Sequence, residues 1–129
     1  MKKILIIDDE ADILKLLKAI MEKKGYEVTT SLNGQDGLLE AYENKPDLII
    51  VDYTMPQMDG LTFIKECKAS DSLKNIPVMI LTAHDETEIN FMKAGAVNFM
   101  TKPFQTKDLL EMVAKSLNPK KKGLFGFSK

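Results

Sequence analysis

The chain has 129 residues, of which 44% are hydrophobic and 29% charged, and this composition is typical of one globular domain with a single core. The formal net charge of −1 at pH 7 argues against nucleic-acid binding driven by charge alone. A single cysteine excludes an internal disulfide, and no apolar run is long enough to span a membrane, so we expect a soluble, cytoplasmic protein.

Short apolar runs alternate with segments of helical periodicity along the first half of the chain. The run Ile4–Ile7 is continuous and rich in β-branched residues, which is typical of a strand buried on both faces. Apolar residues then recur at helical spacing over residues 13–21, and Gly25 is the expected end of that helix. A second strand is predicted over Tyr26–Thr30, and Asn33 is the expected N-cap of the helix that follows.

The second half of the chain continues this alternation. Three further apolar runs are predicted as strands, at Leu48–Val51, Val78–Leu81 and Val97–Met100. Helical spacing predicts helices over residues 61–67 and 109–117. Between them a further helix is predicted, with a capping box formed by Asp85 and Glu88 at its start and Gly95 at its end. Each predicted strand is therefore followed by a predicted helix.

Five strand–helix units in strict alternation imply an α/β fold with an open parallel sheet and helices on both faces. Right-handed crossovers leave few topologies, and the leading one is the doubly wound, flavodoxin-like (βα)5 sheet with strand order 2-1-3-4-5. We assign residues 1–118 to this one domain and residues 119–129 to a flexible basic and aromatic C-terminal tail. In such sheets the ligand site lies beyond the carboxyl ends of the strands.

Polar and charged side chains stand at four of the five predicted strand ends. They are Asp8 and Asp9 after the first strand, Asp52 after the third, Thr82 after the fourth and Lys102 after the fifth. The predicted strand order makes these four strands neighbours, so their ends should form one pocket. Clustered carboxylates repel one another unless a cation joins them, and hard oxygen ligands suit Mg²⁺. A hydroxyl and an ammonium group nearby suit the binding of phosphoryl oxygens. The alternative, that these are ordinary solvent-exposed polar residues, does not explain why this combination occurs at four strand ends.

The motifs around these residues resemble the response-regulator receiver domain of two-component systems, in its stand-alone chemotaxis-regulator type. The resemblance rests on four motifs in order: Asp8-Asp9 after an apolar strand, Val51-Asp52-Tyr53-Thr54-Met55-Pro56 with Asp59-Gly60, Leu81-Thr82-Ala83, and Lys102-Pro103-Phe104. Each motif alone is weak, but all of them in order and in register are highly specific. The resemblance covers almost the whole predicted fold.

The resemblance implies a single-domain response regulator, which is a phosphorylated signalling switch and not a turnover enzyme. Asp52 would be the phosphoacceptor, with Lys102 and Thr82 binding the phosphoryl group. The donor would be a sensor histidine kinase or a phosphotransfer protein, and the receiver of the signal would be an unknown downstream protein, with no nucleic-acid partner. The protein would catalyse its own phosphoryl acceptance and hydrolysis.

The resemblance also implies a metal site and a switch. Mg²⁺ would be the cofactor, bound by Asp9, Asp52 and the backbone carbonyl of Thr54, with Asp8 helping directly or through water. Thr82 and Phe99 would move together on phosphorylation and change the surface of the fourth helix, fifth strand and fifth helix. The bond before Pro103 would be cis. An exposed loop residue is the favoured interpretation of His84, and the alternative is that His84 and Thr54 line access to the phosphoryl group and tune its hydrolysis.

Three other functions fit the residues less well. A haloacid-dehalogenase-like phosphatase has a second aspartate two residues after its nucleophile, where this chain has Thr54. A flavodoxin-like flavin site needs a neutral phosphate loop, which Asp8 and Asp9 would disfavour by charge repulsion. A degenerate receiver used only as a scaffold typically lacks one of the acids, the threonine or the lysine, and this chain lacks none of them.

The tail combines four lysines with apolar residues, at Lys120, Lys121, Lys122 and Lys129 and at Leu124, Phe125 and Phe127. A disordered, solubilising end is the favoured interpretation. Contact with an anionic membrane or with an acidic groove on a partner, and a linker remnant, are the alternatives.

Overall fold

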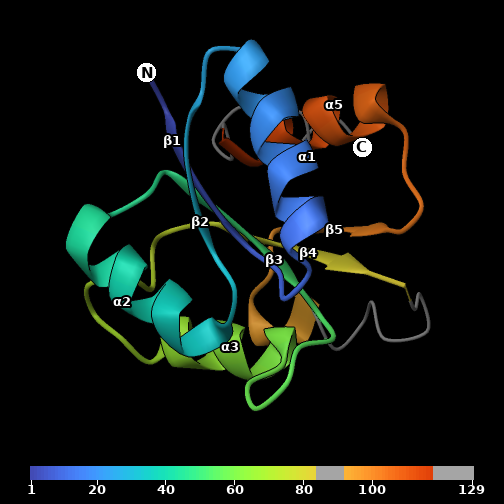
Figure 1. The fold of residues 1–129 in the computed structure, drawn as a ribbon. Helices are drawn as coiled ribbons and strands as arrows, with labels where there is room; N and C mark the ends of the chain where they lie inside the picture. Colours follow the sequence, from blue (N-terminus) through green and yellow to red (C-terminus); the bar gives the residue numbers. More distant parts are fainter. Residues whose placement is uncertain (84–91, 118–129) are drawn as a thin grey trace, which may run out of the picture.

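A parallel five-stranded sheet with the order β2-β1-β3-β4-β5 forms the centre of this computed structural model, which describes residues 1–83 and 92–117 (Figure 1). The strands are β1 (Lys3–Ile7), β2 (Glu27–Ser31), β3 (Leu48–Asp52), β4 (Val78–Thr82) and β5 (Asn98–Thr101). The doubly wound, flavodoxin-like order predicted from the sequence is confirmed.

Helices cover both faces of the sheet. The helices are α1 (Ala11–Lys23), α2 (Gly34–Asn44), α3 (Gly60–Lys68) and α5 (Thr106–Leu117). Figure 1 shows α1 and α5 on one face and α2 and α3 on the other. Residues 92–94 are also helical, but the predicted cap of that helix at Asp85 and Glu88 lies outside the described residues.

Alternate residues of each strand pack into two separate cores. Ile4, Ile6 and Ile50 belong to the core under α1 and α5, and Leu5 and Ile7 to the core on the opposite face. Side chains alternate between the faces of a strand, so a strand covered on both sides must be apolar throughout. This explains why the central strands are unbroken apolar runs, and every residue of β3 and β4 is buried.

The predicted element ends need small corrections. β2 and β5 each begin and end one residue later than predicted. Tyr26 does not start β2, because its N–H donates to the Met21 carbonyl and belongs to the turn that ends α1. Lys24 is the C-cap of α1, and Gly25 follows it with a φ of +94°, a conformation that favours glycine. The predicted cap at Asn33 is confirmed, since its Oδ1 accepts a hydrogen bond from the Asp36 N–H at 2.8 Å.

Among the described residues, no helix is long and apolar enough to cross a membrane. The tail assigned to residues 119–129 and the loop residue His84 lie outside the described ranges.

Candidate functional site

The carboxyl ends of β1, β3, β4 and β5 meet at one edge of the sheet. Asp52 is the last residue of β3 and lies opposite Leu81 of β4, and Thr82 of β4 lies opposite Thr101 of β5. The Lys102 N–H donates to the Thr82 carbonyl at 2.7 Å, which continues the pairing of the strands into the pocket. Parallel register therefore brings the predicted residues Asp52, Thr82 and Lys102 to the same edge of the sheet, at successive levels.

Asp8 follows β1 and is buried, with only 1% of its surface exposed. Its backbone N–H donates to the Ser31 carbonyl at 3.1 Å, and its Oδ1 accepts a hydrogen bond from the Glu10 N–H at 2.9 Å. A buried carboxylate is costly unless it is paired and hydrogen-bonded. These contacts fix the Asp8 side chain before any ligand binds, whereas Asp9 is exposed at the rim of the pocket.

Lys102 joins two of the buried carboxylates. Its Nζ lies 2.8 Å from Asp52 Oδ1 and 3.2 Å from Asp8 Oδ2. The Lys102 side chain is 20% exposed and that of Asp52 8%, so water screens these contacts only weakly. The ammonium group is thus held against the predicted phosphoacceptor by short, charge-assisted hydrogen bonds.

The ionisation of Asp52 reflects opposing influences. Burial raises the pKa of its carboxyl group above the usual value, the Lys102 hydrogen bond and charge lower it, and the charges of Asp8 and Asp9 raise it further. The pKa of Lys102 is also raised, because the bonds and charges of Asp52 and Asp8 outweigh the effect of burial. An ion pair with Lys102 alone would lower the pKa of Asp52. The pKa is raised instead, because the single ammonium group does not offset the combined effect of burial and of the two neighbouring acids.

The three acids form a group that could bind a metal ion. Single carboxylate oxygens of Asp8, Asp9 and Asp52 all lie within 4.8 Å of one another. Three carboxylates around one lysine leave an excess of negative charge, and carboxylate oxygens are the ligands that Mg²⁺ prefers. The donor chemistry of these residues therefore fits a magnesium ion.

The β3–α3 loop is held close to the end of strand β3. The Gly60 N–H donates to the Tyr53 carbonyl at 2.9 Å, and a Cβ at Gly60 would lie 2.9 Å from the Asp52 carbonyl oxygen. Asp59 caps α3 by accepting a hydrogen bond from the Thr62 N–H at 2.8 Å. Glycine is needed at residue 60 because the helix starts in contact with the backbone of Asp52.

The structure also describes the other predicted residues except His84. Thr82 is fully buried, Thr54 is exposed in the loop after β3, and Phe99 on β5 is half-buried against the core under α2 and α3. The Lys102–Pro103 peptide bond is cis. The structure therefore brings Asp8, Asp9, Asp52 and Lys102 together, places Thr82 at the next strand end, and leaves Thr54 exposed in the loop after β3.

Sequence reasoning missed two features of the site. The backbone groups of Ser31 and Glu10 fix Asp8, and a backbone contact carries no residue-specific signal in a sequence. Gln57 in the β3–α3 loop has a φ of +72°, which is unusual for a residue with a side chain. A glycine or asparagine there would have revealed the turn.

Comparison with known proteins agrees with this geometry. The family model described as the response regulator receiver domain matches residues 4–114. The chemotaxis protein CheY of Bacillus subtilis is 38% identical over 90% of this chain and 98% of its own length. The transcriptional regulatory protein for alkaline phosphatase synthesis from the same organism is 37% identical over 84% of this chain but only 45% of its own length.

The chain thus spans about half the length of some curated relatives and nearly all of others. Among solved structures, a response regulator receiver domain protein from Clostridium thermocellum is 35% identical and superimposes with a TM-score of 0.86, over 94% of this chain and 98% of that one.

Proposed function

This chain belongs to the family of response regulator receiver domains, and we propose that it is a Mg²⁺-dependent phosphoacceptor switch of the cytoplasm. In this proposal Asp52 receives a phosphoryl group from a sensor histidine kinase or a phosphotransfer protein. The observation that carries it is the 2.8 Å contact of Lys102 Nζ with Asp52 Oδ1 inside a cluster of three acids. Ordinary solvated strand ends would neither bury Asp52 nor hold an ammonium group against it.

The chemistry follows from these positions. A carboxylate oxygen of Asp52 attacks phosphorus, an O–P bond forms, and the P–N bond to the donor imidazole breaks. The imidazole nitrogen keeps the electron pair and takes up a proton. Charge on the transferring oxygens is stabilised by the Lys102 ammonium group, so the protein contributes mainly positioning and electrostatics. Attack of water on phosphorus later releases inorganic phosphate and restores the carboxylate.

Asp9, Asp52 and the backbone carbonyl of Thr54 would hold Mg²⁺, with Asp8 helping directly or through water. The excess negative charge of the acidic cluster supports this assignment. When bound, the ion supplies positive charge that stabilises the phosphoryl oxygens. Asp8 is held by the Glu10 N–H and by Lys102, and its orientation thereby limits how the other two acids can approach a ligand.

The output step uses Thr82 and Phe99. Thr82 is buried one residue beyond the level of Asp52, and its hydroxyl would bond a phosphoryl oxygen. Phe99 is only half-buried and lies on the neighbouring strand β5. Inward movement of its ring would therefore bury more apolar surface, which is favourable. A ligand shifts such an equilibrium only through interactions that differ between the two states. The new bonds of Thr82 and Lys102 would supply that difference and change the surface formed by the fourth helix, β5 and α5.

Acetyl phosphate provides the test, with intact mass as the measurement. With Mg²⁺ present the protein should gain one phosphoryl group, and Asp52→Asn should remain unmodified. Asp59→Asn is the matched control, since Asp59 caps α3 through an oxygen that asparagine retains. Equal modification of the Asp52→Asn variant would show that the phosphoacceptor is another residue.

A further inference from the structure

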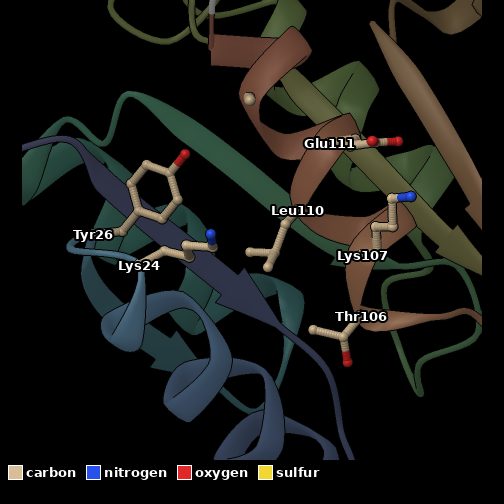
Figure 2. Close-up of a pocket in the computed structure, with 7 residues that line it drawn as sticks. Lys24, Tyr26, Thr106, Lys107, Leu110 and Glu111 are labelled. Atoms are coloured by element: carbon tan, nitrogen blue, oxygen red, sulfur yellow. The ribbon is translucent and has the colours of Figure 1, made fainter.

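A groove separate from the phosphorylation pocket lies between the end of α1 and the outer side of α5. Its volume is about 550 Å³, and its lining includes Lys24, Tyr26, Lys107, Leu110, Glu111 and Ala114. Figure 2 shows Leu110 of α5 pointing toward Tyr26 and Lys24 across the groove. None of the acids around Asp52 belongs to this lining, so the groove needs an explanation of its own. We call it the α1–α5 groove.

The α1–α5 groove combines an apolar centre with a mainly positive rim. Leu110 and the Tyr26 ring are half-buried, whereas Lys24, Lys107 and Glu111 are exposed around them. Two ammonium groups and one carboxylate leave a net positive charge, although the whole chain carries a net charge of −1. A partner that fits must therefore offer apolar side chains flanked by acids.

An apolar stripe on α1 leads to this groove. Leu16 and Ile20 precede Lys24 by two helical turns and one, so they follow the same side of the helix. Leu16 is 54% exposed and Ile20 is half-buried, so the stripe presents apolar surface to solvent. The stripe and the groove together form a surface longer than the groove itself.

The shape and charge of this surface exclude two other occupants. The groove is more open than enclosed, whereas a small-molecule site buries most of its ligand. The chain's own tail, residues 119–129, carries four lysines and no acid, so it would bring like charges against Lys24 and Lys107. A protein segment of negative charge fits the observations that these two occupants do not.

We propose that the α1–α5 groove docks an amphipathic, acidic segment of a partner protein. Apolar side chains of the segment pack against Leu110 and the Tyr26 ring, and its carboxylates face Lys24 and Lys107. This binding is distinct from phosphoryl transfer at Asp52. Because the rim lysines are exposed, their charges govern the rate and specificity of docking more than its total affinity.

Short synthetic helical peptides with leucine on one face and glutamate on the other provide the probe. Amide-resolved NMR titration of the full chain should show shifts at Lys24, Tyr26 and residues 106–114, weaker at high salt. The double substitution Lys24→Glu/Lys107→Glu should weaken binding about tenfold, a size expected for two exposed charge contacts reversed in sign. A peptide with lysine in place of glutamate should bind that variant better than the wild type.

Lys115→Glu is the control for charge reversal on α5 outside the groove lining, with half the total charge change of the double substitution. Its affinity for the acidic peptide should stay close to that of the wild type. All variants should accept phosphate from acetyl phosphate as the wild type does, which establishes that they fold and separates this test from that of Asp52. Three results would overturn the proposal: no binding of the acidic peptide, equal binding by the charge-reversed variant, or shifts of the groove amides when the chain is ended at Asn118, which would make the tail the occupant.

Discussion

The substitution Lys102→Met tests how the buried acids are balanced, because it removes the ammonium group and keeps most of the aliphatic side chain. Lys102 Nζ lies 2.8 Å from Asp52 Oδ1 and 3.2 Å from Asp8 Oδ2. At an effective dielectric constant near 20, each contact is worth roughly 5 kcal/mol before desolvation. Desolvation of the ions offsets much of this, and breaking one buried pair typically costs about 3–5 kcal/mol.

Lys102 keeps 20% of its side chain in water, so we expect a loss at or just below the lower limit of that range, about 2–3 kcal/mol in the free energy of unfolding. For a chain of this size that lowers Tm by roughly 6–12 °C. The measurement is thermal and urea unfolding at neutral pH in the presence of a chelator. Added Mg²⁺ should restore more stability to the variant than to the wild type, because an ion that binds only the folded state stabilises it.

The sign of the pH dependence follows from the raised pKa of Asp52. A raised carboxyl pKa destabilises the folded protein where the group is charged, and the penalty is relieved as pH falls through the raised pKa toward the ordinary value. Lys102→Met removes two influences that lower this pKa, so its stability deficit should be largest at neutral pH and smaller in acid.

A double-mutant cycle with Asp52→Asn checks the cause of the loss. With Asp52 neutral, Lys102→Met should cost clearly less, since only the contact with Asp8 remains. An unchanged stability of Lys102→Met at neutral pH without Mg²⁺, or the same loss in both backgrounds, would refute the electrostatic account.

Three further predictions concern the metal, the loop and the switch. Asp9→Asn should weaken Mg²⁺ binding by about tenfold or more, measured by titration of a spectroscopic probe, with little loss of stability because Asp9 is exposed; unchanged affinity would exclude it as a ligand. Gly60→Ala should lower the free energy of unfolding by about 1–3 kcal/mol, because its Cβ would lie 2.9 Å from the Asp52 carbonyl oxygen; wild-type stability in urea would contradict that contact. Beryllofluoride with Mg²⁺ should change the amide chemical shifts of Thr82 and of the β5 residues, including Phe99. Changes confined to the acidic pocket would count against the switch.

The sequence alone indicated the leading strand order and determined which residues stand at the strand ends. Short, β-branched apolar runs such as Leu48–Val51 are typical of strands covered on both faces, and strict alternation with helices leaves few parallel topologies. Asp52 and Thr82 could be assigned to one pocket because the carboxyl ends of neighbouring parallel strands share one edge. The resemblance added the roles of these residues, which no periodicity could supply.

Only the tertiary structure decided how those side chains are held. Lys102 lies against Asp8 as well as Asp52, and the Glu10 N–H fixes Asp8, contacts that depend on distances between segments far apart in the chain. The one-residue shift of β2 likewise depends on a bond from the Tyr26 N–H to the end of α1. Sequence periodicity specifies which face of an element is apolar, whereas packing and backbone hydrogen bonds between elements determine which polar atoms meet.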